Sequence, residues 1–416
     1  MPPAALVPRL RVGFRGPLLA VVIRGERAFC QVQDFYHGHW KDHWIFEISL
    51  ADGALLGAFF AEAANEHNVH NGPFAVAGDS ILSPISSVLQ AWRISTGAPL
   101  PVIGAPERRR RSIDYRAGWR DMGVGLLVDG GARALVQERD ETLGLWDLEA
   151  GRRVGELRER MGPIQCAALH PDGARLAIAT SSRLRLWHIG RGVAERSIGE
   201  VTGRTASLAF RPDGGALVAC NPRGLVTTWN LERGGRPVVR AMLTRGLVYD
   251  AEGDRCAAVV MEPNPEPEPG DEGLLARVLR VWDVRTQEGT IAHRLPYLHN
   301  PKYGLGRETL AVGCLPGGRL VLQDHHQLTV FERGEAAAQL AGPSFNGLGA
   351  FEGDDEDAGE DLPFGSCGPP VVVWQAGRPG CRRVSTGELR ATLRWPVVRA
   401  GPWSRWILDP RGRRGA

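Results

Sequence analysis

Histidines are concentrated in three short runs whose side chains could ligate a metal or exchange protons. The densest run covers residues 37–43 (HGHWKDH), and the others contain His67 with His70, and His325 with His326. A zinc site needs three or four N, O or S ligands at about 2.0–2.3 Å, and none of these runs has the spacing of a zinc motif. Solvated loop histidines are therefore the favoured interpretation, and we predict neither a metal nor another cofactor.

A Gly-Asp-Ser run at Gly78, Asp79 and Ser80 superficially resembles the nucleophile block of some esterases. A catalytic serine needs a strand-to-helix elbow, a positioned base and oxyanion donors. Here the run lies between two strand-like segments, so turn chemistry is the favoured interpretation. The sequence also has no phosphate-binding loop and no glycine fingerprint placed between a strand and a helix. We therefore expect no catalytic residues and no enzyme activity.

Four consecutive arginines form the only concentrated basic run, Arg108, Arg109, Arg110 and Arg111. Guanidinium groups bind carboxylates and phosphates through paired hydrogen bonds, so this run is our candidate site for an acidic partner. The alternative is an ordinary exposed loop, because arginine replaces lysine almost everywhere in this chain: Lys41 and Lys302 are its only lysines. That bias, together with 53 glycines, is typical of a bacterial protein encoded by a GC-rich genome.

The composition favours a folded cytoplasmic protein. Its 416 residues include 50 basic and 47 acidic side chains, a net charge of +3, without the basic excess of a nucleic-acid-binding protein. A hydrophobic fraction of 43% is sufficient for a large core. We find no signal peptide and no apolar run long enough to cross a bilayer. The seven cysteines form no C-x-x-C pair, and we expect reduced, mostly buried thiols.

Pairs of strand-like segments recur along the chain. In one type of hairpin, alternating apolar residues lead into a tryptophan, one polar residue, an aliphatic residue and a turn, as around Trp146 and Trp187. A second hairpin precedes it, with turns such as residues 170–173 (HPDG) and 211–214 (RPDG). Proline, aspartate and glycine each favour a tight turn. Two hairpins per unit predict a four-stranded sheet.

An aromatic residue occupies the same slot in most units, and we predict that it fills the space between neighbouring sheets. Burying one such ring is worth ~1.5–3 kcal/mol, so we interpret these residues as structural rather than as a ligand cage. The slots lie 41 to 54 residues apart, and four-stranded units that recur at about 40–45 residues are typical of a β-propeller. The predicted anchors are Phe46, Trp92, Trp146, Trp187, Trp229, Trp282 and Phe331, with Arg382 in the slot of an eighth unit.

The dipeptides Trp146-Asp147 and Trp282-Asp283 make residues 16–395 similar to the WD-repeat (tryptophan–aspartate repeat) β-propeller family, in a divergent bacterial form. The family's Gly-His pair before the innermost strand is missing, so we expect blade stability to come mostly from packing between sheets. The resemblance implies an all-β fold, a single closed propeller of four-stranded antiparallel blades. Eight readable units favour eight blades, and seven, the commonest number in the family, is the alternative.

We divide the chain into an N-terminal extension or closing strand (1–15), the propeller (16–395) and a C-terminal strand or tail (396–416). The resemblance implies a non-enzymatic scaffold for protein–protein interaction. We also expect a monomer that binds neither nucleic acid, because its charge is nearly balanced, nor membrane, because it has no apolar run of bilayer length. The alternative is an enzyme, or a small-molecule or metal sensor, that uses the histidine runs at the mouth of the central channel. The partner is an unidentified protein.

Because antiparallel strands alternate in direction, the loops of a blade emerge on two faces. This alternation predicts that the histidine runs, the four arginines and the Pro/Glu-rich insert at 262–273 share one face. The acidic insert at 354–361 is predicted on the other face. We expect the first of these two faces to bind the partner.

Overall fold

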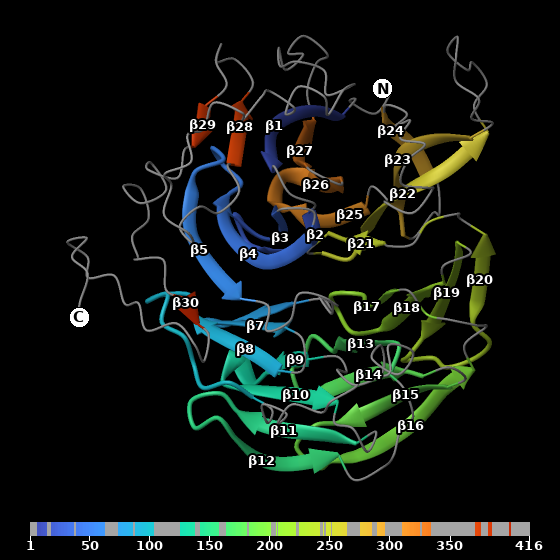
Figure 1. Ribbon diagram of the computed structural model, residues 1–416. Coiled ribbons are helices and arrows are strands. Elements are labelled where there is room, and N and C mark those ends of the chain that lie inside the picture. Colours follow the sequence, from blue (N-terminus) through green and yellow to red (C-terminus); the bar gives the residue numbers. More distant parts are fainter. Residues whose placement is uncertain are drawn as a thin grey trace, which may run out of the picture.

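The computed structural model is a propeller of seven antiparallel sheets, or blades, arranged in a ring (Figure 1). Second strands such as Ala216–Cys220 are apolar and buried along their whole length, because each sheet is covered on both faces by its neighbours. The part of the chain that the structure describes includes no α-helix, and hence none that could span a membrane. It comprises residues 6–14, 18–36, 39–62, 74–85, 88–103, 125–137, 142–157, 164–180, 183–200, 205, 207–221, 224–241, 244, 247–250, 252–263, 275–284, 289–295, 310–324, 327–333, 371–375, 382–384 and 399–400.

Blades 1 to 3 are built from consecutive strands that run in order from the inner to the outer position. Blade 1 contains β2 (Leu18–Arg24), β3 (Arg27–Tyr36), β4 (His39–Ser49) and β5 (Leu55–Glu62). Blade 2 contains β6 (Ala75–Ala77), β7 (Ser80–Ile85) and β8 (Val88–Arg93), and isolated bridges at Pro99 and Ile103 occupy its outer position. Blade 3 contains β9 (Gly125–Val128), β10 (Arg133–Gln137), β11 (Leu143–Asp147) and β12 (Arg152–Leu157), with the short 3-10 turn η1 (Asp129–Gly131) between its first two strands.

Blades 4 to 6 follow the same order. Blade 4 contains β13 (Cys166–Leu169), β14 (Arg175–Ala179), β15 (Arg183–His188) and β16 (Val193–Glu200). Blade 5 contains β17 (Ser207–Phe210), β18 (Ala216–Cys220), β19 (Leu225–Asn230) and β20 (Val238–Ala241). Blade 6 contains β21 (Val248–Tyr249), β22 (Arg255–Pro263), β23 (Leu275–Asp283) and β24 (Gly289–Leu295).

Blade 7 joins the two ends of the ring. Its first three strands are β25 (Leu310–Leu315), β26 (Arg319–Asp324) and β27 (Gln327–Arg333), with the 3-10 turn η3 (Pro316–Gly318) between the first two. The fourth is the N-terminal strand β1 (Leu6–Phe14), which lies antiparallel to β27. C-terminal strands extend two sheets: β28 (Val371–Gln375) and β29 (Arg382–Val384) lie outside β1, and β30 (Arg399–Ala400) pairs parallel with β5.

The preference for eight blades was therefore wrong, and the alternative of seven is what the structure shows. Arg382 lies in β29, at the edge of the blade 7 sheet, and not in a blade of its own. The inner strand of blade 1 contacts β25 and β26 directly, so no further sheet fits between blades 7 and 1. Val12 and Phe14 pack with residues of blade 1 in one buried cluster at this closure.

The strand register confirms that the four tryptophans Trp146, Trp187, Trp229 and Trp282 occupy equivalent positions. Each pairs with the second residue of the preceding strand, and Trp92 and Phe331 do the same. In blade 1 that position belongs to Ile48, which pairs with Ala28, so the slot assigned to Phe46 is two residues too early. Phe46 still points to the same side of the sheet and is fully buried.

The anchors other than Trp282 pack against the preceding blade, whereas Trp282 packs with Ala258 and Val260 of its own blade. Trp187, for example, is 1% exposed and lies in a cluster with Val128 and Leu135 of blade 3. Trp229 packs in the same way against blade 4, whereas Trp146 and Trp282 remain partly exposed. The buried indole N–H groups of Trp92 and Trp229 have no acceptor among the described residues, so packing rather than hydrogen bonding holds these two rings.

Candidate functional site: the hairpin face

The turns between the first and second strands of all seven blades lie on one side of the ring, which we call the hairpin face. The loops between the third and fourth strands emerge on the same side, because strand direction alternates. The opposite side, the connection face, carries the loops between second and third strands and between blades. Most residues of those loops lie outside the described part of the chain.

The residues predicted to bind a partner are not among those described. Arg108, Arg109, Arg110 and Arg111 fall between Ile103 and β9, and the His67–His70 and His325–His326 runs fall in similar gaps. The backbone of residues 39–43 begins β4, but their side chains lie outside the description. The arrangement of these side chains therefore stays a prediction.

The two inserts lie mostly outside the described residues. Residues 262–273 follow the sequence from the end of β22 toward β23, the second and third strands of blade 6, and the face on which they lie stays a prediction. The acidic insert at 354–361 was placed on the hairpin face as part of an eighth blade. The structure has no eighth blade, so the argument that placed the acidic insert on the hairpin face no longer holds. Residues 354–361 themselves lie outside those described.

An arginine begins the second strand in five of the seven blades, directly after the hairpin turn: Arg27, Arg133, Arg175, Arg255 and Arg319. Four of these five guanidinium groups form an ion pair with a nearby carboxylate. Arg27 pairs with Glu47, Arg133 with Asp129, Arg175 with Asp172, and Arg319 with Glu26. Our sequence interpretation missed this repeat. The signal was present, because each of these arginines lies two residues after a glycine of a turn.

Arginine hydrogen bonds also connect neighbouring blades across this side of the ring. Arg319 pairs with Glu26 between blades 7 and 1, and the Arg24 guanidinium donates to the Gly78 carbonyl oxygen between blades 1 and 2 (2.5 Å). Arg93 pairs with Glu149 between blades 2 and 3. Arg196 Nη2 donates to the Leu231 carbonyl oxygen between blades 4 and 5 (2.8 Å). These bonds fix the positions of the turns relative to one another.

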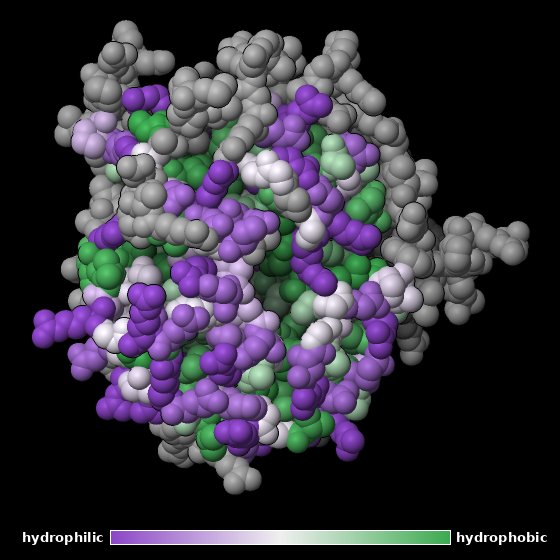
Figure 2. All heavy atoms as spheres, turned by 180° about the vertical axis from the view of Figure 1, so that it is seen from behind, coloured by the Kyte–Doolittle hydropathy of each residue, from purple (hydrophilic) through white to green (hydrophobic). Residues whose placement is uncertain are grey.

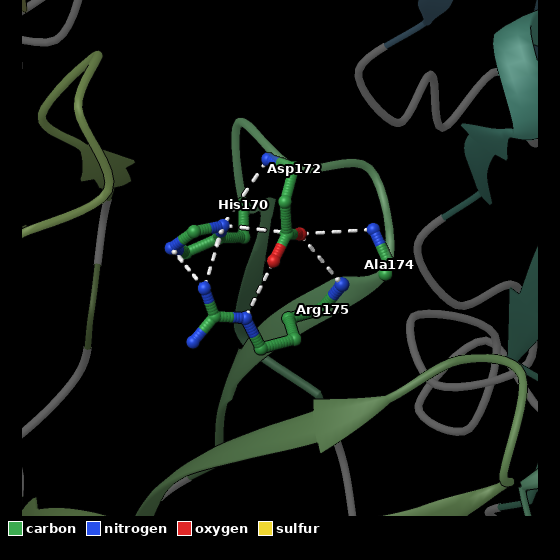
Figure 3. A network of polar contacts seen from close by, with 4 residues as sticks. All are labelled: His170, Asp172, Ala174 and Arg175. Carbon is green, nitrogen blue, oxygen red and sulfur yellow. Dashed lines mark hydrogen bonds and ion pairs between the residues drawn. The ribbon is translucent and has the colours of Figure 1, made fainter.

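Blade 4 contains the most connected polar group on this face (Figure 3). The Asp172 carboxylate accepts hydrogen bonds from the backbone N–H groups of Ala174 (2.9 Å) and Arg175 (3.1 Å), and from Arg175 Nε (2.6 Å). Partial burial acts to raise the pKa of Asp172, but these hydrogen bonds outweigh it and lower the pKa to about 2. The carboxylate is therefore ionised throughout the physiological range.

His170 ties this group to blade 5. Its ring lies in an edge-on contact with Phe210, with ring centres 4.9 Å apart, and its Nδ1 accepts a hydrogen bond from the Asp172 backbone N–H (3.2 Å). A Cβ added to Gly214 in the blade 5 turn would lie only 2.4 Å from His170 Nε2. Glycine is therefore required at this positive φ and this close approach, and the turns of blades 4 and 5 are locked together.

The serine of the Gly-Asp-Ser run and the described cysteines lie in turns or buried strands, where they contribute to the fold. Gly78 and Asp79 form the hairpin turn between β6 and β7, as predicted, and the Asp79 carboxylate accepts the Ser95 backbone N–H (2.7 Å). Ser80 is buried in that hairpin. Burial raises the pKa of the Cys166 thiol to about 11 and those of Cys256 and Cys314 to about 12.

The remaining described cysteines are similar. Burial also raises the pKa values of Cys30 and Cys220. All five described cysteines are free thiols, and because burial raises the pKa of each, none has the lowered pKa that would make it reactive at neutral pH. Within the described ranges, no group of three or more His, Cys, Asp or Glu side chains is placed to hold a metal ion.

No protein-family model matches the chain, and no curated protein sequence matches it. The propeller fold therefore rests on the strand pairing and the register of the anchors. The similarity to WD repeats rests on the tryptophan-containing hairpins themselves.

Proposed function

We propose that the protein is a non-enzymatic scaffold for protein–protein interaction that uses the faces of its propeller. The observation that carries this proposal is the set of arginine hydrogen bonds that links neighbouring blades on the hairpin face. These bonds hold neighbouring blades in fixed positions, and loops carried by a rigid scaffold are where proteins commonly place their binding residues. Seen from the side opposite to Figure 1, the described surface carries mostly hydrophilic side chains with scattered hydrophobic ones (Figure 2).

The partner-binding residues in this proposal are Arg108, Arg109, Arg110 and Arg111, in the loop between blades 2 and 3. Four adjacent guanidinium groups complement an acidic protein surface and accelerate its association, most strongly at low salt. In this proposal the protein acts as a monomer in the bacterial cytoplasm, without a cofactor, and its partner is an acidic protein. The WD-repeat resemblance supports the same function.

The test is affinity capture from cells that contain the protein, with identification of the captured partners. Replacing Arg108–111 by serine should weaken capture, and the loss should be larger at low salt than at high salt. Thermal stability should change little, since exposed substitutions usually alter it by less than about 0.5 kcal/mol.

A matched control replaces four exposed arginines of the hairpin face, Arg152, Arg153, Arg191 and Arg255, by serine. This variant has the same net charge as the first, so a difference between the two locates the binding face. Capture that is lost only in the control assigns the partner to the hairpin face. If both variants capture the same partners with the same salt response as the unmodified protein, neither arginine set binds them and the proposal fails.

A further inference from the structure

The outer edges of the blades accept an additional strand in this protein. The C-terminal strand β28 lies antiparallel along β1, from Leu10 opposite Gln375 to Phe14 opposite Val371. The short strand β30 lies parallel to β5. Two adjacent sheets are thus extended at the rim of the ring, one in each orientation (Figure 1). In the described part of the chain, β12, β16, β20 and β24 remain the last strands of their sheets.

The edge at β20 differs from the others in its exposure. Every residue from 232 to 240 is exposed, the longest such run among the described residues. Val238 and Val239 are each 53% exposed, more than any other large hydrophobic residue that the structure describes. Hydrophobic side chains are visible at the left rim in Figure 2, the side of the ring on which β20 lies in that view.

Charge also distinguishes this edge. Arg233, Arg236 and Arg240 surround the two valines, and Glu232 is the only acidic residue in the run. None of the three guanidinium groups forms an ion pair with a described residue. The outer strand of blade 3 differs, since its Arg153 is paired with Glu156 (2.7 Å). The β20 edge therefore presents uncompensated positive charge beside exposed apolar area.

The register shows which side of the sheet each residue faces. Arg240 lies opposite Val226, which packs toward Tyr249 of blade 6, so Val238 and Arg240 face blade 6. Val239 lies opposite Thr227, on the side of Trp229 and blade 4. An added strand would therefore meet one exposed valine on each side of the sheet.

We infer that the outer edge of β20 binds an extended acidic segment of a partner protein as a fifth strand of blade 5. Backbone N–H and C=O groups of alternate β20 residues point away from β19 and supply the main-chain hydrogen bonds of such an addition. Apolar side chains of the segment cover Val238 and Val239, while its carboxylates pair with Arg236 and Arg240. This inference rests on the proposed scaffold function and names one surface and one class of partner for it.

A competing explanation is protection of the edge. Proline, arginine and short length are also devices by which proteins prevent unwanted strand pairing, and β20 follows Pro237. The two explanations make different predictions: a protected edge binds no peptide, whatever charge the peptide carries, whereas a binding edge selects acidic peptides.

The test uses random twelve-residue peptides displayed on phage, selected against the full-length protein. We expect enrichment of peptides in which Asp or Glu alternates with β-branched residues. A synthetic copy of an enriched peptide should bind about tenfold more weakly to the R236S/R240S variant, the loss expected for two exposed charge pairs. It should bind equally to R152S/R153S, the matched control on β12. Hydrogen exchange should show protection of the backbone amides of residues 238–241.

Three outcomes overturn the inference: no acidic peptide is enriched, R236S/R240S binds the peptide as well as the unmodified protein, or protection appears away from β20. A peptide with proline at its centre keeps the charge but cannot form a continuous strand, so equal binding of this peptide also overturns it. Failure of this test with intact capture through Arg108–111 leaves the scaffold function standing. Loss of both removes the scaffold function as well.

Discussion

Replacing Trp187 by alanine is the most direct test of how the ring is held together. Trp187 lies on β15 and fills the space between blades 3 and 4, where it packs with Val128, Leu135 and Leu157. It is 1% exposed, so almost the whole ring is removed from water on folding. Alanine at this position would leave a cavity beside the facing residues of blade 3. The two sheets cannot move together to fill this cavity, because each is also packed against its other neighbour in the closed ring.

The expected cost follows from the buried area. An aromatic side chain buries roughly 150–250 Å², and burying such a ring fully is worth about 1.5–3 kcal/mol. Alanine keeps a small part of that area, and the cavity left behind adds a further cost, so we expect a loss of about 3–5 kcal/mol in the free energy of unfolding. The stability of a folded domain is about 5–15 kcal/mol, so the variant should still fold.

Urea unfolding, followed by far-UV circular dichroism, measures this loss. Trp187→Phe keeps most of the ring and should lose less than half as much, and Trp146→Ala should also lose less because Trp146 is only partly buried. A loss below 1 kcal/mol for Trp187→Ala would falsify the assignment of Trp187 as an anchor. A larger loss for Trp146→Ala than for Trp187→Ala would contradict the link between burial and anchoring.

Three further predictions test the closure, the polar turn and the thiols. Val12→Asp puts an unpaired charge at a fully buried position of the closing strand β1 and should lower the stability by more than ~3 kcal/mol in thermal unfolding, unlike the exposed Arg9→Ser. Because the pKa of Asp172 is lowered to about 2 in the folded protein, its contribution is present above pH ~4 and disappears as the pH falls through 2. Asp172→Asn should therefore cost less than ~1 kcal/mol at pH 7, since the side chain is partly exposed, and a cost that persists below pH 2 contradicts this account. Burial raises the pKa of the Cys30 thiol, so iodoacetamide at pH 8 should modify Cys30 only in urea, and rapid modification of the native protein contradicts its burial.

The local elements were predictable from the sequence because their causes are local. A turn such as residues 170–173 specifies its own conformation through proline, aspartate and glycine, and the alternation on either side specifies two strands. The equivalence of Trp187 and Trp229 followed from their similar distances to such turns, 14 residues from Gly173 and 15 from Gly214, and the register confirms it.

Blade 1 shows where the pattern became ambiguous. Three apolar residues of β4, Trp44, Phe46 and Ile48, point to the same side of the sheet at intervals of two. Hydrophobicity favoured the aromatic Phe46 for the slot, whereas the hydrogen bond from the Leu50 N–H to the Glu26 carbonyl oxygen sets the register at Ile48. Shifting the strand register by two residues keeps the same side chains on the buried face. The alternation of apolar and polar residues therefore cannot distinguish the two registers.

The number of blades could not be predicted from the sequence pattern, for a different physical reason. The residues around Arg382 have the local pattern of a repeat unit, and they do form a strand, β29. Which sheet a strand joins depends, however, on which edge is free when the ring closes. That decision involves contacts between residues some 300 positions apart, such as the hydrogen bond from Gln323 Nε2 to the Leu18 carbonyl oxygen (3.0 Å, 305 residues apart). The N-terminal strand β1 takes the outer place in blade 7, so the last unit can only add to edges already present, as β28, β29 and β30 do. The C-terminal strands β28, β29 and β30 therefore show that the outer edges of this propeller accept further strands.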